Sequence, residues 1–371
     1  MQQQEASDLY LTVGLPPAYR IHGEIVRSDA PALHAADCEA LARSAMNERQ
    51  WQRFADEYEM NLALAYDDVG RFRANIFRQR GQIGMVVRKI NTAIPTIDEL
   101  GLPAIFKEIS MQARGLVLMT GATGCGKSTS LAAMIDWRNS HQAGHIITIE
   151  DPIEFIHNHK QSVITQREVG SDTFEYHTAL KNTLRQAPDV ILIGEIRDRT
   201  TMAHAIEFAE TGHLCLATLH ANSANQALER VINFFPEEMH PQVCLNLSLN
   251  LKAILSQRLV RSHQERRLPA TEILVNTPRI ADLIGKWEIE EIKTAMRDGA
   301  QYGMQTFDQC LFKLWQSGQI SETEALRHAD AINDLRLQIK MAAIGHQQSP
   351  DDALDQLSPN LTTSDWRPPQ H

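Results

Sequence analysis

The sequence has little cysteine, and none of it is closely paired. Only five of its 371 residues are cysteines, and no two of them lie within four residues of each other. The five are Cys38, Cys125, Cys215, Cys244 and Cys310. Structural zinc sites and disulfide frameworks usually have closely spaced cysteines, so the sequence favours neither and indicates a reducing compartment.

The sequence also lacks long apolar runs and a positive net charge. No stretch approaches the roughly 18 apolar residues of a membrane helix. The first residues, MQQQEASDLYLTVG, have neither the basic region nor the apolar core of a signal peptide. We therefore expect a cytosolic protein with at most peripheral membrane contact. The formal net charge of −10 counts against a dedicated nucleic-acid binder, because such domains are usually basic.

Apolar residues, at 43%, are numerous enough for sizeable cores, and the length suggests two or three domains. The first part alternates strand-like runs with one helical stretch over residues 38–59. We predict a smaller α+β domain over 1–94, a linker over 95–102, a larger domain over 103–345 and a tail over 346–371. A hinge is expected at Asn91 to Leu102. The tail is polar and carries four prolines, so we expect it to be mostly disordered.

From Arg114 onward, continuous apolar runs alternate with helical stretches. The runs are GLVLMTG, HIITIE, VILIGE and HLCLATLH, with a further strand expected in PATEILVN. Such runs are typical of a parallel sheet covered by helices on both faces. The predicted fold class is therefore α/β with a parallel-rich sheet, and the part after Val260 is expected to be mostly helical.

The stretch GATGCGKST has the pattern G-x-x-x-x-G-K-[ST], after an apolar run and before a helical one. Backbone N–H groups of such a loop and the following helix N-terminus bind phosphate. We expect Lys127 to contact the β- and γ-phosphates and Ser128 to bind magnesium. The predicted ATP-binding residues are Gly121, Ala122, Thr123, Gly124, Cys125, Gly126, Lys127, Ser128 and Thr129.

Cys125 has two interpretations. It is either a small residue tolerated in the loop or a thiol whose pKa is lowered at a helix N-terminus. On the second interpretation, alkylation inhibits ATP binding and ATP protects the thiol.

The run VILIG is followed by Glu195, the natural group to polarise an attacking water. In many P-loop enzymes a magnesium-handling carboxylate stands where Gly194 stands here. We expect the stretch TIEDPIEF to supply it, through Glu150, Asp151 and Glu154, because parallel strands deliver their carboxyl ends to one edge of a sheet. The alternative interpretation of these acids is a solvated strand exit.

Two histidines flank the run LCLATL. His213 and His220 lack the cysteines or close partners usual for metal ligation. A histidine at a strand end is commonly a packed or capping residue. His220 has a second interpretation, as a sensor of the γ-phosphate.

Arginines are the remaining requirement, because a guanidinium stabilises the charge of the transferred phosphoryl group. Arg167 and Arg185 follow the first acidic strand. Arg71 and Arg73 belong to the first domain and would contact a neighbouring subunit's nucleotide. For each of the four, a surface salt bridge is an equal alternative.

Together these motifs resemble the type II/type IV secretion ATPases. The stretches GATGCGKST, TIEDPIEF, QREVG, VILIGEIRD and TGHLCLATLHANSA look like their Walker A, Asp box, arginine segment, Walker B and His box. The glycine before the Walker B glutamate is usual in that family. Within it, the chain is most similar to the PilT/PilU family of type IV pilus retraction ATPases, since DLYLTVGLPPAYRIHGEI and GMQTFDQCLFKLWQSGQIS also match. The resemblance covers roughly residues 5–340.

The resemblance implies a PAS-like N-terminal domain, a RecA-like ATPase domain and a hexameric ring. In such rings the N-terminal domain of one subunit packs on the ATPase domain of the next. It implies ATP and Mg²⁺ as cofactors, Glu195 as the catalytic acid, and a location at the cytoplasmic face of the inner membrane. The implied partners are a PilT-like ATPase and an inner-membrane pilus platform protein.

One departure from the family concerns retraction. PilT-like proteins carry a helix close to AIRNLIRE, whereas RIADLIGK, Arg279 to Lys286, lacks its paired basic residues. With the segment ADAINDLRLQIK and the long tail, this favours the accessory, PilU-like members. This difference argues against retraction by this protein alone, but it does not affect the prediction of ATP hydrolysis.

Three alternatives stay open at this stage. An assembly ATPase would typically carry a four-cysteine zinc motif, which the cysteine spacing does not provide. A RecA-type nucleic-acid motor would need a basic, aromatic segment to hold phosphates. A non-catalytic scaffold would not need both Lys127 and Glu195.

Overall fold

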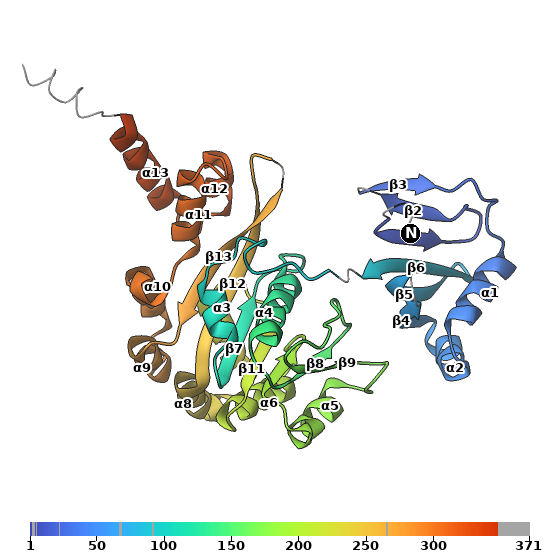
Figure 1. The fold of residues 1–371 in the computed structure, drawn as a ribbon, viewed down its shortest axis with the longest axis horizontal. Helices are drawn as coiled ribbons and strands as arrows, with labels where there is room; N and C mark the ends of the chain where they lie inside the picture. Colours follow the sequence, from blue (N-terminus) through green and yellow to red (C-terminus); the bar gives the residue numbers. More distant parts are fainter. Residues whose placement is uncertain are drawn as a thin grey trace, which may run out of the picture.

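The computed structural model describes residues 1, 4, 6–21, 23–66, 69–90, 93–264 and 266–347. They form two bodies, each built around its own sheet (Figure 1). Of the predicted tail over 346–371, residues from 348 on lie outside the described part. Among the described residues, no helix has the length and apolar character needed to span a membrane.

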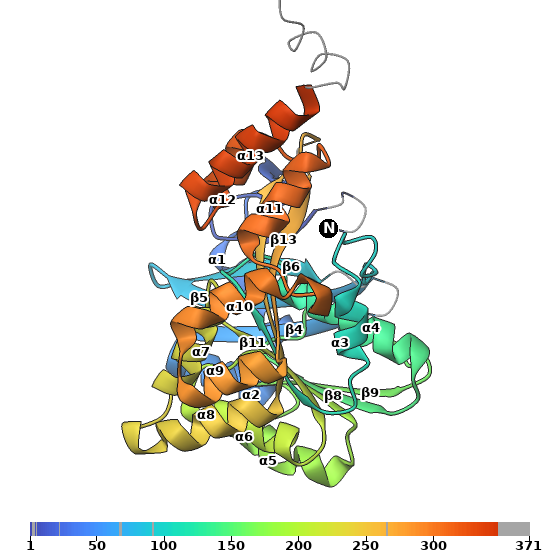
Figure 2. The same ribbon diagram turned by 90° about the vertical axis from the view of Figure 1, so that its left-hand side faces the viewer.

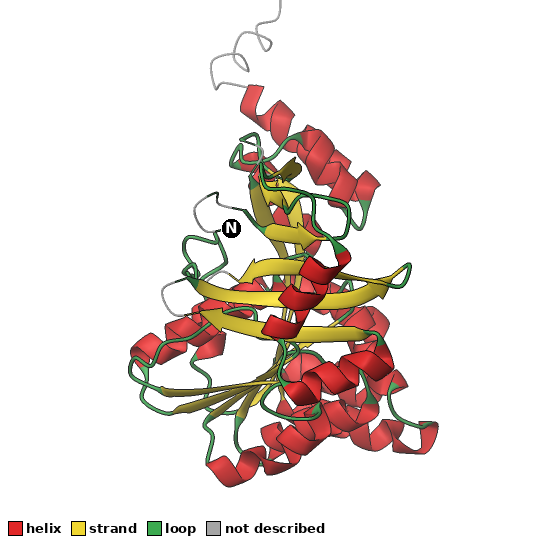
Figure 3. Cartoon of the chain, turned by 90° about the vertical axis from the view of Figure 1, so that its right-hand side faces the viewer, coloured by secondary structure: helices red, strands yellow, loops and turns green. Residues whose placement is uncertain are grey.

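The first body contains a six-stranded antiparallel sheet in the order β3-β2-β1-β6-β5-β4. Its strands are β1 (Asp8–Leu11), β2 (Ala18–Ile21), β3 (Glu24–Arg27), β4 (Glu59–Tyr66), β5 (Gly70–Gln79) and β6 (Gln82–Ile90). Helices α1 (Ala35–Ala45) and α2 (Glu48–Glu57) lie across one face of the sheet (Figure 3). The α+β architecture expected for this part is confirmed.

Alternation along β5 shows why only one face of this sheet is covered. Phe72, Ala74 and Ile76 are buried in the core that α1 and α2 complete. Successive side chains of a strand point to opposite faces, so Arg71 and Arg73 lie on the other face. Arg73 is exposed there and Arg71 is partly exposed.

The single helix predicted over 38–59 is wrong, because the chain breaks it at Met46 and Asn47. The Asn47 side chain accepts a hydrogen bond from the Gln50 N–H, and the Gln50 side chain accepts one from the Asn47 N–H, each at 2.9 Å. This reciprocal capping box starts a new helix, α2, in a different direction.

The second body contains a seven-stranded sheet in the order β13-β12-β7-β11-β10-β8-β9. All neighbouring strands are parallel except β12 and β13. The strands are β7 (Gly115–Thr120), β8 (His145–Glu150), β9 (Val163–Glu168), β10 (Val190–Ile193), β11 (Leu214–Leu219), β12 (Leu251–Arg261) and β13 (Arg267–Val275). The predicted parallel-rich α/β sheet is confirmed.

Helices cover both faces of this sheet, as continuous apolar strands require. Along β7, Leu116 and Leu118 pack with one helical layer, whereas Val117 and Met119 pack with the other. The first layer is α5 (Tyr176–Thr183), α6 (Arg199–Glu210), α7 (Ala224–Asn233), α8 (His240–Asn250), α9 (Pro278–Lys286) and α10 (Ile289–Asp298). The second layer is α3 (Ile105–Ser110) and α4 (Lys127–His141). Short 3₁₀ turns lie at η1 (Leu184–Gln186), η2 (Glu237–Met239) and η3 (Ala300–Tyr302).

The last three helices form a small cluster at one end of the molecule (Figure 2). They are α11 (Phe307–Gln316), α12 (Glu322–His328) and α13 (Ile332–Gln347). Their apolar side chains pack against Val260 and Ala270, near the far ends of β12 and β13. The long β12–β13 hairpin therefore connects one edge of the sheet to the carboxyl-terminal helices.

Part of the segment predicted as a linker is packed. Ile97 and Leu102 are buried in the same core as α3 and α4. Of the residues 91–102 expected to act as a hinge, those from Ile97 on therefore belong to the second body. Asn91 and Thr92 lie outside the described residues.

Candidate active site

The loop after β7 is shaped by three glycines. Gly121, Gly124 and Gly126 have φ angles of +146°, +77° and +88°, which other residues rarely adopt. At Gly121 a Cβ atom would also lie only 2.5 Å from the Gln257 carbonyl oxygen. Gly126 is the N-cap of α4, so the loop leads directly into a helix N-terminus. This is the geometry of an anion-binding loop.

Lys127 is the first residue of α4 and is almost fully buried. Its Nζ donates hydrogen bonds to the carbonyl oxygens of Gly121 and Ala122, at 2.8 and 3.0 Å. The ammonium group thus lies against the loop itself. Ser128 and Thr129 follow in the first turn of α4 and are partly exposed. All these residues belong to the predicted ATP-binding segment.

A glutamine from β12 holds the loop from behind. The Gln257 Nε2 donates to the Cys125 carbonyl oxygen at 2.7 Å, and its Oε1 accepts from the Ser130 hydroxyl at 2.8 Å. Gln257 and Ser130 are buried, so neither bond is exchanged readily for one to water. Gln257 was not among the predicted site residues, because β12 was not predicted.

We expect Gln257→Leu to destabilise the loop. The substitution keeps a side chain of similar size but leaves the Cys125 carbonyl and the Ser130 hydroxyl without partners. The free energy of unfolding should fall by about 2 kcal/mol. Nucleotide affinity should fall about tenfold, since the variant must order the loop on binding. Thermal unfolding and equilibrium binding of a fluorescent ATP analogue measure the two effects. The exposed Gln319→Leu is the control, and equal behaviour of both variants would contradict the assignment.

Burial decides the character of Cys125. Its side chain is buried beneath the loop, and desolvation raises the pKa of its thiol, against the smaller effect of Lys127 that lowers it. The alternative of a reactive thiol with a lowered pKa is therefore wrong. Cys125 is a small residue that fits the loop.

Glu195 lies two residues beyond β10, between an arginine and a histidine. Its Oε2 accepts from the Arg197 Nε at 2.7 Å, and its Oε1 lies 2.9 Å from the His220 Nε2. His220 directly follows β11, the neighbour of β10. The carboxylate is thus oriented from both sides at the edge of the sheet where the glycine loop also lies. Arg197 was missed, although it stands two residues after Glu195 in the stretch GEIRD.

The geometry explains why a glycine precedes this acid. A Cβ atom at Gly194 would lie 3.0 Å from the Glu150 Cα and 3.2 Å from the Ile149 carbonyl oxygen. The Gly194 carbonyl oxygen also accepts a hydrogen bond from the Thr218 hydroxyl of β11. The end of β8 therefore occupies the space that a carboxylate at 194 would need.

The end of β8 brings acids to this edge, as predicted. Glu150 accepts from the Thr148 hydroxyl at 2.7 Å and from the Gln166 Nε2 at 3.3 Å. Burial raises the pKa of Glu150 to about 7, even though these hydrogen bonds act in the opposite direction. Asp151 lies 3.3 Å from Arg197, which thus contacts acids from two strand ends. Glu154 is exposed.

The structure separates the two predicted histidines. His213 precedes β11, and its carbonyl oxygen accepts from the N–H of Gly115, the first residue of β7. It therefore lies at the amino ends of the strands, whereas His220 lies at their carboxyl ends. A strand of six residues places these edges about 20 Å apart. Of these two histidines, His220 is the one that contacts Glu195.

The predicted arginines are also dispersed. Arg185 lies in η1, beside Gln186, whose carbonyl oxygen contacts the first residue of β8, His145. It is thus at the same remote edge as His213. Arg167 pairs with Ile149 in the β-ladder, at the carboxyl edge, but its strand is the fourth from β7, about 19 Å away.

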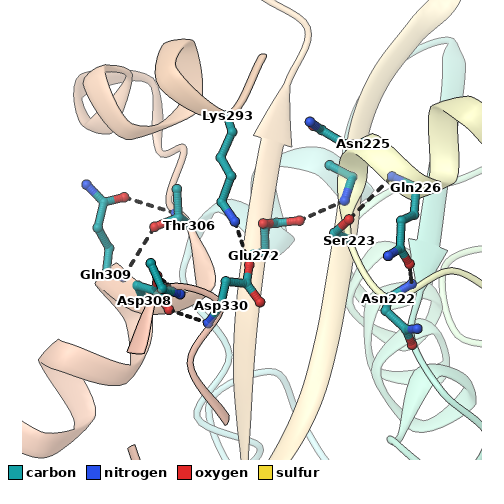
Figure 4. A network of polar contacts seen from close by, with 12 residues as sticks. Asn222, Ser223, Asn225, Gln226, Glu272, Lys293, Thr306, Asp308, Gln309 and Asp330 are labelled. Carbon is teal, nitrogen blue, oxygen red and sulfur yellow. Dashed lines mark hydrogen bonds and ion pairs between the residues drawn. The ribbon is translucent and has the colours of Figure 1, made fainter. Parts of the chain in front are cut away.

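A polar network fixes the loop that carries His220 (Figure 4). The buried Glu272 of β13 accepts from the N–H of Ala224, the first residue of α7, at 2.7 Å. Ser223 and Gln226 cap the same helix start. Burial raises the pKa of Glu272.

The network continues to the carboxyl-terminal helices. Arg258 of β12 lies 2.7 Å from Asp330, which precedes α13, and Lys293 of α10 lies 2.8 Å from the same carboxylate. Burial works against ionisation of Asp330, but the hydrogen bond from Lys293 and the charge of Arg258 hold its pKa below the usual value. Asp308 of α11 accepts from the Asp330 N–H. Contacts of β12, β13 and α10 therefore hold both the loop that carries His220 and the last three helices.

A cavity of about 580 Å³ opens beside the glycine loop. Gly121 and Ala122 line one side of it, and His220, Asn222 and Arg230 line the other. The cavity thus adjoins the groups that a phosphate-bearing ligand would meet.

The residues fit a nucleotide with Mg²⁺. The glycine cradle and Lys127 suit phosphate oxygens. The hydroxyl of Ser128 and the carboxylates of Glu150 and Asp151 are oxygen donors of the kind Mg²⁺ prefers. Within the described ranges, no group of three or more His, Cys, Asp or Glu side chains is placed to hold a metal ion.

Comparison with known proteins identifies the family of this chain. The family model described as "Type II/IV secretion system protein" matches residues 4–313. The chain belongs to this family. Among its relatives, the Type IV pilus ATPase PilU of Pseudomonas aeruginosa is 52% identical, covering 98% of this chain and 94% of that protein.

Two further comparisons agree with this family assignment. The type IV pilus retraction ATPase PilT of Pseudomonas aeruginosa is 42% identical, covering 88% of this chain and 95% of that protein. A crystal structure of the pilus retraction motor PilT with bound ADP is 40% identical with a TM-score of 0.85, covering 90% of this chain and 96% of that one. The fold of this type II/IV secretion family member is therefore that of a PilT-like ATPase.

Proposed function

We propose that the chain is an ATPase that powers or assists the retraction of type IV pili. The observation that carries the proposal is one edge of the sheet, where the glycine loop with Lys127 lies beside Glu195 and His220. The glycine loop and Lys127 suit the phosphates of ATP, and Glu195 with His220 suits an attacking water. The similarity to PilU and PilT supports the mechanical output.

The residues have distinct tasks in this proposal. The glycine loop and Lys127 bind and orient the β- and γ-phosphates, and Glu195 takes a proton from the attacking water. His220 orients Glu195 and faces the terminal phosphate. The Ser128 hydroxyl would bind Mg²⁺, and the carboxylates of Glu150 and Asp151 would help to hold it. When bound, the metal would neutralise charge that develops on the phosphates.

Glu154 and the arginines have tasks beyond this edge. Glu154 is exposed after β8 and would approach the nucleotide of its own subunit. Arg167 lies about 19 Å from the strand of the glycine loop and would serve a neighbouring subunit's nucleotide. Arg185 and His213 are too far from this chain's own loop, so a neighbouring subunit's nucleotide is the one they would serve. Arg71 and Arg73 would do the same from the uncovered face of the first sheet.

These distant residues call for an assembly. We propose a hexameric ring in which the first body, a PAS-like domain over 1–94, packs on the RecA-like ATPase domain of the next subunit. That ATPase domain spans 103–345, with its helical carboxyl-terminal part. ATP binding would close the interface and hydrolysis would open it. The PilT structure, which covers 90% of this chain at 40% identity, supports the shared fold of both bodies.

The proposed setting is the cytoplasmic face of the inner membrane. The ring would dock on an inner-membrane pilus platform protein and act together with a PilT-like ATPase, as the accessory motor. The 52% identity to PilU supports the accessory role, and so does the stretch RIADLIGK in α9. Mg²⁺ is the proposed metal and ATP the proposed nucleotide.

The test is steady-state hydrolysis of ATP by the purified chain, with and without a PilT-like ATPase whose own site is inactivated. We expect Mg²⁺-dependent hydrolysis by the chain alone and a several-fold higher rate, about threefold or more, in the mixture. Hydrolysis without stimulation would remove the accessory role. No hydrolysis in either condition would overturn the proposed activity and favour a nucleotide-binding scaffold.

A further inference from the structure

A tyrosine hydroxyl lies buried at the edge of the candidate active site. Tyr176 is the first residue of α5, which packs against β8. Its Oη atom is buried and has no hydrogen-bond partner among the residues the structure describes. Buried hydroxyl groups normally have a partner, so an unpartnered one indicates a ligand or water that completes it.

The hydroxyl lies next to Gly194, the position at which many P-loop enzymes carry an acid. Its Oη is 3.0 Å from the position of a Cβ atom added to Gly194, on which the Glu150 backbone also closes. In this chain the space beside Gly194 therefore holds a phenol oxygen in place of a carboxylate.

Charged groups of the site influence this hydroxyl group. Asp151, Arg197, Glu150 and Glu195 all act on Tyr176 electrostatically. Burial, followed by the charge of Asp151, raises the pKa of the phenol, so the group stays protonated at neutral pH. A protonated phenol can donate one hydrogen bond through its O–H and accept another at its oxygen.

We propose that Tyr176 is a positioning residue for magnesium: its phenol oxygen accepts a hydrogen bond from a water of the metal's hydration shell, in place of the acid absent at 194. Mg²⁺ keeps several waters in protein sites, and such outer-sphere contacts orient them. The inference rests on the proposed function, because it assumes that a metal–nucleotide complex binds at this edge.

The test is Tyr176→Phe, which removes one oxygen and keeps the ring that packs in the core. Electron paramagnetic resonance measures Mn²⁺ bound to the full chain with ADP, and a fluorescent ADP analogue measures nucleotide affinity without metal. We expect Mn²⁺ affinity about tenfold lower in the variant, with metal-free ADP affinity unchanged. The ATP turnover number should fall by a similar factor, while KM at saturating Mg²⁺ stays within about twofold.

Tyr302→Phe, at an exposed tyrosine of η3, is the matched control and should equal the wild type. Unchanged Mn²⁺ affinity in Tyr176→Phe would overturn the inference. So would an equal loss of nucleotide affinity with and without metal, because it would indicate packing alone. If the wild type bound ADP but no Mn²⁺, or hydrolysed no ATP, the proposed function would fail first, independently of Tyr176.

Discussion

Lys127→Ala should abolish ATP hydrolysis and lower nucleotide affinity at least about a hundredfold. The lysine Nζ already lies against the glycine loop, 2.8 Å from the Gly121 carbonyl oxygen, where phosphate oxygens would meet it. A buried ammonium in a site of low dielectric contributes two charge-assisted hydrogen bonds to the phosphates, and alanine supplies neither. Steady-state hydrolysis and equilibrium binding of a fluorescent ATP analogue measure the two losses.

The fold should tolerate this substitution. The Lys127 side chain bonds only to carbonyl groups of its own loop, so the free energy of unfolding should change by no more than about 1 kcal/mol. Lys160→Ala is the control, since Lys160 is a half-exposed lysine of the same domain that pairs with Asp136. Hydrolysis at the wild-type rate in Lys127→Ala would show that the glycine loop is not the phosphate site.

Glu195→Gln should trap ATP in the site while slowing turnover about 10²- to 10⁴-fold. Glutamine keeps the size of the side chain and one oxygen to accept from Arg197, but it cannot take a proton from water. Affinity for ATP should therefore stay within a few-fold of the wild type. Single-turnover experiments, which follow the ratio of bound ATP to bound ADP, distinguish trapping from weak binding.

The matched control for this variant is Glu207→Gln, an exposed glutamate of α6 that pairs with His204. It should hydrolyse ATP like the wild type. Turnover retained by Glu195→Gln would move the proton acceptor elsewhere. Glu150 is then the next candidate, because its carboxyl pKa of about 7 suits proton exchange at neutral pH.

The parts of the site predicted from sequence are those made of consecutive residues. Gly121 to Ser128 form a loop of consecutive residues, so the motif and the flanking strand and helix specify its whole structure. Glu195 and Glu150 were also predicted, because each follows an apolar run that identifies a strand end. Strand length alone would have separated His213 from His220, since a six-residue strand carries them to opposite edges.

Residues that depend on contacts far along the chain were not predicted. Gln257 lies 132 positions after Cys125, the residue whose carbonyl it binds. Its strand, β12, was missed because α8 ends at Asn250 and β12 starts at Leu251, with no turn residue between them. This apolar stretch is a strand because it pairs with β7 and β13. Such pairing depends on residues far along the chain and cannot be predicted from the local sequence.

The first body shows a local signal that was missed. The break between α1 and α2 is set by Asn47 and Gln50, a polar N-cap and its partner three residues later. Apolar spacing near one helical period continues through the break, so periodicity alone predicted one helix. Capping residues carried the information that periodicity lacked.

The crowding around Gly194 limits how this lineage of sequences can change. An aspartate or glutamate at that position would have to displace the Glu150 backbone and the Tyr176 hydroxyl together. An acid at 194 would therefore need the segment after β8 and the start of α5 to move as well. The acidic residues of the site are divided between the ends of β8 and β10. The crowding at Gly194 opposes the placement of an acid at position 194.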